Sequence, residues 1–250
     1  MDPTFFSQLS AVARQAIDAE CRAGLIAENK AGQGFDPVTR ADRAAERALR
    51  SLIEQCFPEH GIWGEEFGMV RGDAPVRWSL DPVDGTRALL CGLPSWSILV
   101  GLIEDGRHIA GMIDLPVLGE TLIGHGGVTL RNGKAVRTSG CAMLGEARLA
   151  TTDPTLFDAG ESAAFDRVRA AARVTRYGLD ALGYARVATG DLDLVVENKL
   201  QPHDYDALVA VVRGAGGHIG DWQGGDSFAT GQIVAAATRT LYDETVALLA

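Results

Sequence analysis

Apolar residues recur at helical spacing in two stretches near the start of the chain. The first repeat predicts an amphipathic helix from Phe5 to Ile26. The second repeat is rich in alanine, follows Pro37-Val38-Thr39, and predicts a helix that ends before Pro58. Residues 24–36 between the two are irregular and predict a loop.

The pattern changes to short apolar runs from residue 76 onward. The predicted strands cover residues 76–80, 95–104, 107–114, 120–124 and 128–130. Asp81-Pro82 is expected to end the first of these strands, and Asp105-Gly106 favours a tight turn between the second and the third. We therefore expect the first half to combine two helices with a largely antiparallel sheet.

Strands and helices alternate from about residue 140. The predicted strands cover residues 148–151, 174–177 and 193–197, and the predicted helices cover 165–172, 182–189 and 204–213. Such alternation is typical of an α/β unit, whereas the first half is α+β. We therefore expect two subdomains, residues 1–139 and 140–250, which pack as one compact unit.

Composition indicates a folded protein with a sizeable core. Of the 250 residues, 46% are hydrophobic and 22% are charged, which excludes a disordered chain. The formal net charge of −10 argues against a nucleic-acid partner, because phosphate contacts there need clustered Lys and Arg. A small phosphate ester would need a bound divalent cation to attract it, because the protein's overall field repels it.

Neither a membrane segment nor a cysteine framework is indicated. The four cysteines are widely spread, without a CxxC pair or a paired Cys/His ligand set, so free thiols are expected. The N-terminus lacks a basic segment followed by an apolar run, and no stretch approaches a membrane span. We therefore expect a soluble, cytoplasmic protein.

Two carboxylates lie three residues apart in the run Asp81-Pro82-Val83-Asp84-Gly85-Thr86. Mg²⁺ prefers oxygen ligands, and two aspartates on one turn can share or bracket an ion. Gly85 lets the backbone approach a ligand closely, and amide groups at a helix start form an anion site. The same residues also suit a turn and a helix cap, so the run alone leaves both interpretations open.

Two more acidic residues stand at the ends of predicted elements. Glu65 lies upstream in a Gly-Glu-Glu turn, and Asp204 follows a Pro-His pair at a helix start. Taken separately, Glu65 suits a solvated loop and Asp204 an ordinary helix cap. Together with Asp81 and Asp84, they supply four carboxylates at strand ends or helix starts.

The ordered motifs resemble those of the inositol monophosphatase superfamily of metal-dependent, lithium-sensitive phosphatases. They are Pro37-Val38-Thr39-Arg40-Ala41-Asp42, Gly64-Glu65-Glu66, Asp81 to Thr86, Leu200-Gln201-Pro202-His203-Asp204 and Gly214-Ala215-Gly216-Gly217. The resemblance covers essentially the whole chain. It implies a layered α/β/α/β/α sandwich and a phosphomonoesterase that uses two to three Mg²⁺ ions.

The resemblance also implies the metal ligands. Glu65, Asp81 and the carbonyl of Val83 would hold one Mg²⁺. Asp81, Asp84 and Asp204 would hold a second, and Glu65 would contribute to a third, weaker ion that positions water. His203 is expected to pack beside these ligands rather than join them, because such metals prefer oxygen.

The remaining implied roles concern the phosphate and the water. Gly85 and Thr86 would bind the phosphate, and Asp42 and Thr86 would polarise the attacking water, with Glu65 as a further catalytic residue. Phosphoryl transfer needs positioning and charge stabilisation, so no Ser, Cys or His nucleophile is required. Asp42 also suits a cap or a salt bridge of the second helix.

Three positions indicate the histidinol-phosphatase branch. Arg87 directly follows the Asp81–Thr86 run, Asp180 replaces a residue that is small and apolar in inositol phosphatases, and Glu197 ends a predicted strand. Histidinol phosphate carries a protonated amine that such carboxylates would complement, whereas inositol offers only hydroxyls. Asp180 also suits a surface loop, and Arg87 a surface or helix-end position.

The first hypothesis is therefore a histidinol-phosphatase of histidine biosynthesis. An inositol-1-monophosphatase or a broad sugar-phosphate phosphatase is the nearest alternative, and a non-catalytic metal-binding partner protein is the alternative from another class. Members of the superfamily are often homodimers, but no residue of this chain points to one. The loop at residues 29–36, with Lys30, departs from the family's usual form and receives no role.

Overall fold

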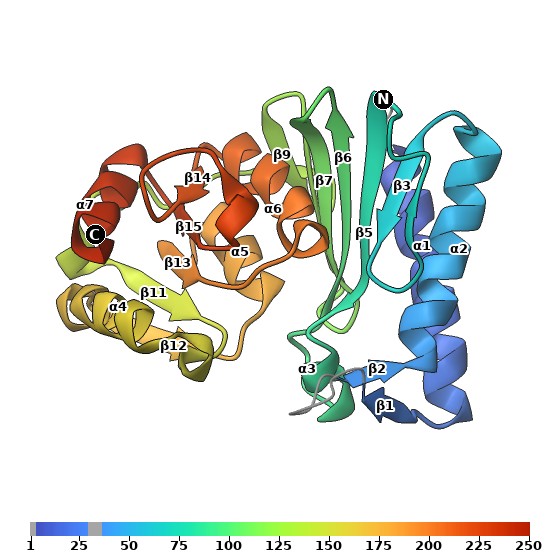
Figure 1. Ribbon diagram of the computed structural model, residues 1–250, viewed down its shortest axis with the longest axis horizontal. Coiled ribbons are helices and arrows are strands. Elements are labelled where there is room, and N and C mark those ends of the chain that lie inside the picture. The colour runs from blue at the N-terminus through green and yellow to red at the C-terminus, as the bar shows by residue number, and fades with distance from the viewer. Residues whose placement is uncertain (1–3, 30–36) are drawn as a thin grey trace.

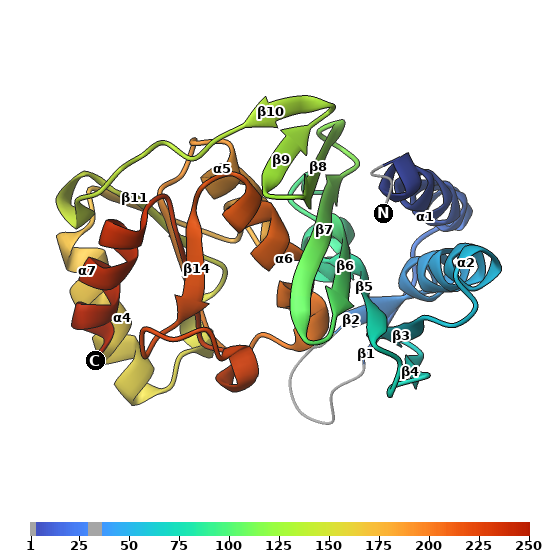
Figure 2. The same ribbon diagram turned by 90° about the horizontal axis from the view of Figure 1, so that it is seen from above.

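The secondary-structure elements stack in five layers. The structure is a computed structural model and describes residues 4–29 and 37–250. Three pairs of helices alternate with two sheets across the molecule (Figures 1 and 2). The pairs are α1 (Thr4–Ala23) with α2 (Arg40–Cys56), α5 (Ala181–Ala188) with α6 (Pro202–Gly214), and α4 (Ala159–Ala171) with α7 (Arg239–Leu249). The expected α/β/α/β/α sandwich is therefore confirmed.

The larger sheet has eight strands in the order β10-β9-β8-β7-β6-β5-β3-β4. They are β3 (Gly61–Gly64), β4 (Gly68–Val70), β5 (Val76–Asp84), β6 (Ser97–Glu104), β7 (Arg107–Leu115), β8 (Glu120–His125), β9 (Val128–Arg131) and β10 (Lys134–Val136). Only β3 and β5 pair in parallel, so the prediction of a largely antiparallel sheet is confirmed. The predicted turn at Asp105-Gly106 joins β6 to β7, and both turn residues have positive φ.

The strand that begins at Val76 does not end at Leu80, as predicted, but continues as β5 through Asp84. Asp81 pairs with Leu99 of β6, and Asp84 pairs with Ser97. Between these two pairs, β5 has two residues where β6 has one, which makes a β-bulge. Pro82 has no N–H to donate and lies inside this bulge, where the ladder needs no donor. The bulge therefore brings both aspartates to the end of one strand.

The smaller sheet has five strands in the order β12-β11-β13-β15-β14. They are β11 (Arg148–Thr151), β12 (Val174–Tyr177), β13 (Leu194–Glu197), β14 (His218–Asp221) and β15 (Ile233–Ala236). Strand β11 runs parallel to both β12 and β13, and the other two pairings are antiparallel. We propose residues 1–139 and 140–250 as subdomains, because the chain leaves the larger sheet after β10 and enters the smaller one at β11.

Several boundaries differ from the predictions. Helix α4 begins at Ala159 rather than at residue 165, because Asp158 and Glu161 form a capping box. Helix α6 begins at Pro202, a favoured first position, and not at Asp204. Part of the predicted loop forms a strand, β1 (Ala27–Asn29), which pairs with β2 (Pro37–Thr39). Residues 30–36, including Lys30, lie outside the described residues.

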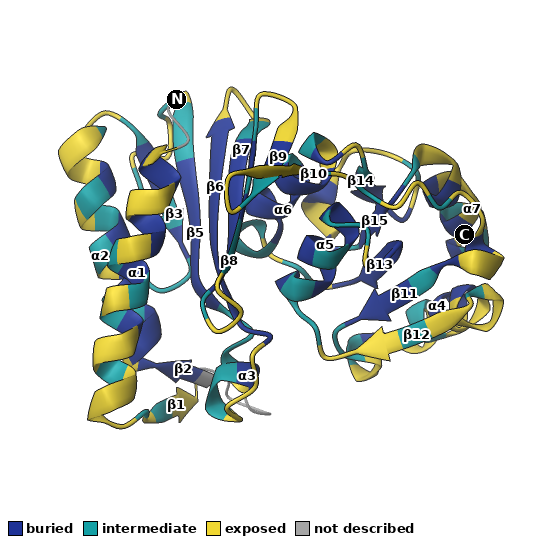
Figure 3. Cartoon of the chain, turned by 180° about the vertical axis from the view of Figure 1, so that it is seen from behind, coloured by how far each residue is buried: buried dark blue, intermediate teal, exposed yellow. Residues whose placement is uncertain are grey.

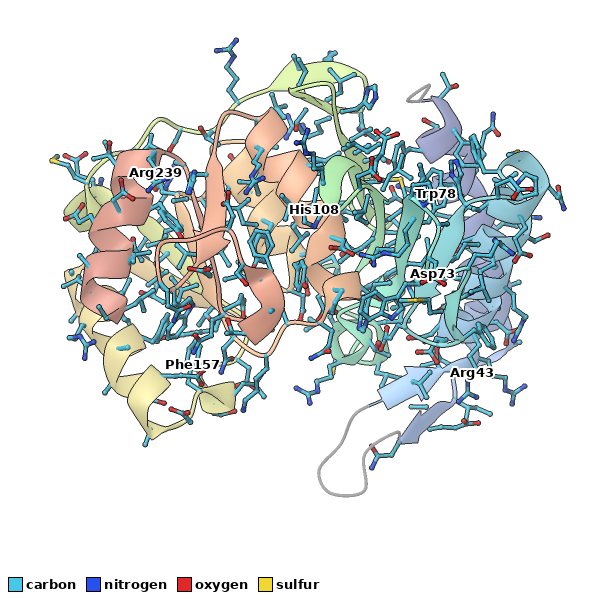
Figure 4. The ribbon with its side chains drawn as sticks, turned by 45° about the horizontal axis from the view of Figure 1, so that its top comes forward. Arg43, Asp73, Trp78, His108, Phe157 and Arg239 are labelled. Atoms are coloured by element: carbon cyan, nitrogen blue, oxygen red, sulfur yellow. The ribbon has the colours of Figure 1, made fainter. Side chains whose placement is uncertain are left out.

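Three apolar cores separate the layers. Trp78 of β5 (labelled in Figure 4) is completely buried against α1 and α2, beside Phe5, Phe6 and Phe57. A second core surrounds α5 and α6, and a third lies between the smaller sheet and α4 and α7. The exposed residues of α1 and α2 follow their outer faces (Figure 3). In residues 4–29 and 37–250, no helix is both long enough and apolar enough to cross a bilayer.

Three glycines form the surface on which α6 packs against the larger sheet. Gly101, Gly111 and Gly124 lie opposite one another on β6, β7 and β8. A Cβ at Gly111 would lie 2.1 Å from the carbonyl oxygen of Ala207, which no real contact allows. The glycines therefore let α6 approach closely and fix its first turn, with Asp204, beside the end of β5.

Candidate active site

A pocket of about 300 Å³ opens where the end of β5 meets the first turns of α5 and α6. Its described walls include six acidic and two basic side chains. These are Glu65, Asp81, Asp84, Asp180, Glu197 and Asp204, with Arg87 and Lys199. Val83, Gly85 and Thr86 also line the pocket, and Asp42 lies behind Thr86. The residues predicted for the site therefore gather around one cavity.

Asp81 is the most buried of the acidic residues at the end of β5. Its side chain is almost fully enclosed, and its Oδ1 accepts a hydrogen bond from the Val83 amide at 3.1 Å. Burial raises the pKa of Asp81 well above its usual range, and the charges of Glu65, Asp84 and Asp204 raise it further. Asp81 thus supports its own turn, as the turn interpretation predicts, and also lies among like charges.

Asp84 connects β5 to the second half of the chain. Its Oδ2 accepts hydrogen bonds from Ser97 Oγ at 2.8 Å and from the Ala181 amide at 2.9 Å. Burial raises the pKa of Asp84 well above its usual range, and the charge of Asp180 adds to the rise. Helix α3 (Thr86–Leu90) begins after Gly85 without a side-chain cap, so neither aspartate of the run caps it.

Asp204 lies in the first turn of α6 and lines the pocket. Its Oδ2 accepts a hydrogen bond from the Gln201 amide at 2.6 Å, within the first turn of α6. Its Oδ1 lies 3.4 Å from Nε2 of His203. Burial raises the pKa of Asp204, His203 lowers it, and Glu65 raises it again. Asp204 therefore supports the helix start and also faces the other acidic residues.

The donor chemistry of the pocket suits a hard divalent cation. Carboxylates and a nearby carbonyl are the ligands that Mg²⁺ prefers, and a cation would stabilise buried acids that raise one another's pKa. The ion pairs of residues 4–29 and 37–250 do not include Asp81 or Asp84. In that same part of the chain, no group of three or more Asp, Glu, His or Cys side chains is arranged so that it could hold a metal ion. The fit of the pocket to a divalent cation therefore rests on the type and the charge of its donor groups.

Asp42 contacts Thr86 from the first turn of α2. Thr86 Oγ1 lies 3.2 Å from Asp42 Oδ1 and 3.0 Å from the Val83 carbonyl oxygen. Asp42 Oδ2 accepts from the Thr39 amide at 3.0 Å and from the Thr39 hydroxyl at 2.5 Å, in a capping box. Burial raises the pKa of Asp42, although the hydrogen bonds from Thr39 lower it. Asp42 therefore caps its helix and also reaches the site.

Asp180 forms the wall next to the Asp81–Thr86 run. A Cβ at Gly85 would lie 3.0 Å from Asp180 Oδ2, so the two residues are in close contact. Burial raises the pKa of Asp180 to about 6, while the charge of Arg87 lowers it and that of Asp204 raises it. Asp180 is thus a wall of the pocket rather than a freely solvated loop residue, whereas Arg87 is exposed.

Glu197 lies deeper, at the end of β13. Its Oε1 accepts from the Thr152 amide at 2.7 Å and from the Thr152 hydroxyl at 2.8 Å. Burial raises the pKa of Glu197 to about 8, although the hydrogen bonds from Thr152 lower it. Because its pKa is raised and its Oε1 already accepts two hydrogen bonds, Glu197 is a weaker partner for a cation than Asp180.

Two buried contacts were not predicted from the sequence. Glu46 is completely buried, and it accepts from the amides of Glu66 at 2.7 Å and Phe67 at 3.2 Å, next to Glu65. Its position four residues after Asp42, on the same helix face, is the one signal that the sequence offers. Thr152 carries no comparable signal, because it acts through main-chain groups that are distant in sequence.

Comparison with known proteins agrees with this geometry. The family model described as "Inositol monophosphatase family" matches residues 3–250. The Bifunctional phosphatase IMPL2, chloroplastic, of Arabidopsis thaliana is 44% identical over 76% of this chain, which spans 56% of the plant protein. A Histidinol-phosphatase of Chlorobaculum parvum is 32% identical over 82% of this chain and 80% of its own length. The solved inositol monophosphatase from Zymomonas mobilis superposes with a TM-score of 0.87 at 39% identity, covering 97% of this chain and 95% of that one. This chain is thus a phosphatase-type hydrolase and belongs to the inositol monophosphatase family.

Proposed function

We propose that the chain is a magnesium-dependent histidinol-phosphatase, which hydrolyses L-histidinol phosphate to L-histidinol and inorganic phosphate. The observation that carries this proposal is the close contact of the Asp180 carboxylate with Gly85. Gly85 belongs to the proposed phosphate site, so Asp180 would lie beside the leaving group of a bound ester. The relationship to the Chlorobaculum parvum protein supports the same substrate.

The acidic residues at the end of β5 are the proposed metal ligands. Glu65, Asp81 and the Val83 carbonyl would hold one Mg²⁺, and Asp81, Asp84 and Asp204 a second, with Glu65 contributing to a third. Bound Mg²⁺ lowers the pKa of the attacking water and neutralises charge on the phosphate and on the leaving oxygen. Without such cations, the ionised carboxylates of the pocket would repel a phosphate ester.

The Asp42–Thr86 pair is proposed to activate the water. The Thr86 hydroxyl carries one hydrogen, which Asp42 or the Val83 carbonyl accepts, so the oxygen lone pairs stay free to accept a hydrogen bond from water. Gly85 and Thr86 would also contact the phosphate oxygens. A fixed acceptor for the water and fixed donors for the phosphate supply the positioning that phosphoryl transfer needs.

The substrate preference is assigned to the wall formed by Asp180. Ionised Asp180 would pair with the ammonium group of histidinol, and Arg87 would line the same end of the pocket. Glu197, proposed from the sequence as a further contact, would act mainly through Thr152. A neutral polyol makes no comparable use of an anionic wall.

The second candidate is an inositol-1-monophosphatase or a broad sugar-phosphate phosphatase. It is favoured by the similarity to the Zymomonas mobilis inositol monophosphatase along almost the whole chain. Both candidates use the same proposed metal and phosphate sites, so the distinction lies in the leaving group alone.

A panel of phosphomonoesters, assayed with Mg²⁺ and with a chelator, tests the proposal. We expect kcat/KM for L-histidinol phosphate to exceed that for inositol 1-phosphate and glycerol 2-phosphate by at least about tenfold, and chelation to abolish turnover. A higher kcat/KM for inositol 1-phosphate would support the second candidate. If no ester is hydrolysed with Mg²⁺ present, the chain is a non-catalytic partner protein.

A further inference from the structure

The backbone of Asp180 has an uncommon conformation for a residue with a Cβ. Its φ is 49° and its ψ is −142°, a combination that is costly outside glycine. Strain of this kind persists only where the surrounding contacts impose it. The contacts around Asp180 therefore show what fixes the direction of its carboxylate.

Thr152 holds the segment before and at Asp180 from two sides. The Thr152 carbonyl accepts a hydrogen bond from the Gly178 amide at 2.8 Å, and its hydroxyl accepts one from the Asp180 amide at 3.1 Å. The next amide, that of Ala181, donates to Asp84 at 2.9 Å. The amides of Asp180 and Ala181 are thus held by acceptors that lie in different directions. This arrangement imposes the positive φ of Asp180.

Glu197 holds Thr152 in turn. The amide and the hydroxyl of Thr152 both donate to Glu197 Oε1, at 2.7 Å and 2.8 Å. Because the hydroxyl has one hydrogen and gives it to Glu197, its lone pairs face the Asp180 amide. Glu197 is 5% exposed, so little solvent competes for these hydrogen bonds. The arrangement is a chain of hydrogen bonds from Glu197 through Thr152 to the backbone of Asp180.

We propose that Thr152, supported by Glu197, is a positioning residue that holds Asp180 in its strained conformation and thereby sets the preference for esters with a cationic leaving group. This inference rests on the proposed function, because it assigns that preference to Asp180. Without the Thr152 hydroxyl, the peptide relaxes and the Asp180 carboxylate turns away from Gly85.

Two substitutions at residue 152 separate positioning from general damage. Thr152→Val keeps the side-chain shape but removes the hydroxyl, and Thr152→Ser keeps the hydroxyl. The quantity to measure is the ratio of kcat/KM for L-histidinol phosphate to kcat/KM for inositol 1-phosphate, which cancels any loss common to both esters. We expect Thr152→Val to lower this ratio at least about tenfold and Thr152→Ser to keep it within about threefold of the wild type.

The same measurement with Asp180→Asn completes a double-mutant cycle. Asp180→Asn alone should lower the ratio, and adding Thr152→Val should lower it no further, because both changes remove one interaction. An unchanged ratio in Thr152→Val, or an equally large drop in the Asp180→Asn background, would overturn the inference.

A thermal measurement tests the inference without a substrate. Asp180→Gly should raise Tm in the otherwise wild-type protein by relieving the strain, and should raise it less when Thr152→Val is also present. Equal Tm changes in both backgrounds would contradict a positioning role. If the wild type shows no preference for L-histidinol phosphate, the proposed function fails, and this Tm comparison alone decides whether Thr152 positions Asp180.

Discussion

The hydroxyl oxygen of Thr86 lies 3.2 Å from a carboxylate oxygen of Asp42, although 44 residues separate them in sequence. The other carboxylate oxygen of Asp42 accepts two hydrogen bonds from Thr39 at the start of α2. Asp42 is therefore a member of the capping box of α2 and also a hydrogen-bond partner of Thr86. Through this contact, the helix layer supports the proposed site at the end of β5.

Removal of the Thr86 hydroxyl should therefore impair chemistry more than binding. We expect Thr86→Val to lower kcat by about 100-fold at saturating Mg²⁺, because the attacking water loses an oriented acceptor. Thr86→Ser keeps the hydroxyl and should keep kcat within about tenfold of the wild type. Equal losses in the two variants, measured by phosphate release, would show that the hydroxyl has no part in the reaction.

Glu46 should control metal affinity through the turn that carries Glu65. In Glu46→Gln an amide group replaces one of the oxygens that accept from Glu66 and Phe67, so one backbone donor loses its acceptor. We expect the Mg²⁺ concentration for half-maximal activity to rise about tenfold, with a smaller change in kcat at saturating Mg²⁺. Glu54→Gln, on the exposed face of the same helix, is the control and should not change this concentration. A fall in kcat alone would argue against a role in metal binding.

The raised pKa of Glu197 predicts how the stability of the metal-free protein depends on pH. This pKa rises from 4.5 to about 8 on folding, so the native state binds a proton that the unfolded state has released. The resulting stability is complete below about pH 4.5 and is lost as the pH rises towards 8. Over that range, this one residue should lower the free energy of unfolding by about 1.4 kcal/mol per pH unit.

Glu197→Gln tests this pH dependence directly. Glutamine can accept both hydrogen bonds from Thr152 and does not titrate. Urea unfolding in a chelator between pH 5 and 8 should therefore show a smaller decline for Glu197→Gln than for the wild type. Asp180, whose pKa is about 6, titrates in both proteins. Identical slopes would mean that Glu197 does not hold a proton in the native state.

The Arg14–Asp114 pair should be the ion pair on which the first helix layer most depends. Asp114 is completely buried and accepts from Arg14 Nε at 2.7 Å and Nη2 at 2.5 Å, and also from Ser10 and Thr121. Arg14→Met would leave a buried carboxylate without its cation, at a cost of about 3–5 kcal/mol. Urea unfolding measures this cost.

An exposed pair supplies the matched control for that substitution. Arg239 (labelled in Figure 4) pairs with Asp243 at 2.7 Å, and both side chains are exposed. Arg239→Met should change the free energy of unfolding by less than about 1 kcal/mol. Similar changes for Arg14→Met and Arg239→Met would contradict the distinction between the buried and the exposed pair.

Local patterns explain the parts of the fold that could be predicted. Helical periodicity located α1 and α2, and Asp105-Gly106 located a hairpin, because each signal lies within a few neighbouring residues. The continuation of β5 through Pro82 depends instead on its pairing with Leu99 and Ser97 of β6. A local pattern does not identify such a partner, and on its own the proline predicts the end of the strand.

The difference between local patterns and contacts between distant residues also applies to the site. Glu65, Asp81, Asp84 and Asp204 could be proposed because each stands at the end of an element within a recognisable motif. Glu46 and Thr152 could not, because they act on the main chain of residues that only the fold brings near. Glu197 lines the pocket, but its hydrogen bonds to Thr152 depend on a contact between distant parts of the chain that no local pattern predicts.

The central claim is that the acidic pocket is a divalent-metal site, and calorimetric titration of Mg²⁺ tests it most directly. Burial raises the pKa of both Asp81 and Asp84, so bound Mg²⁺ should displace protons from them. We therefore predict saturable binding whose heat depends on the ionisation enthalpy of the buffer, and its loss or strong weakening in Asp84→Asn. Absence of Mg²⁺ binding in the wild type, or the same binding in Asp84→Asn, would contradict the account.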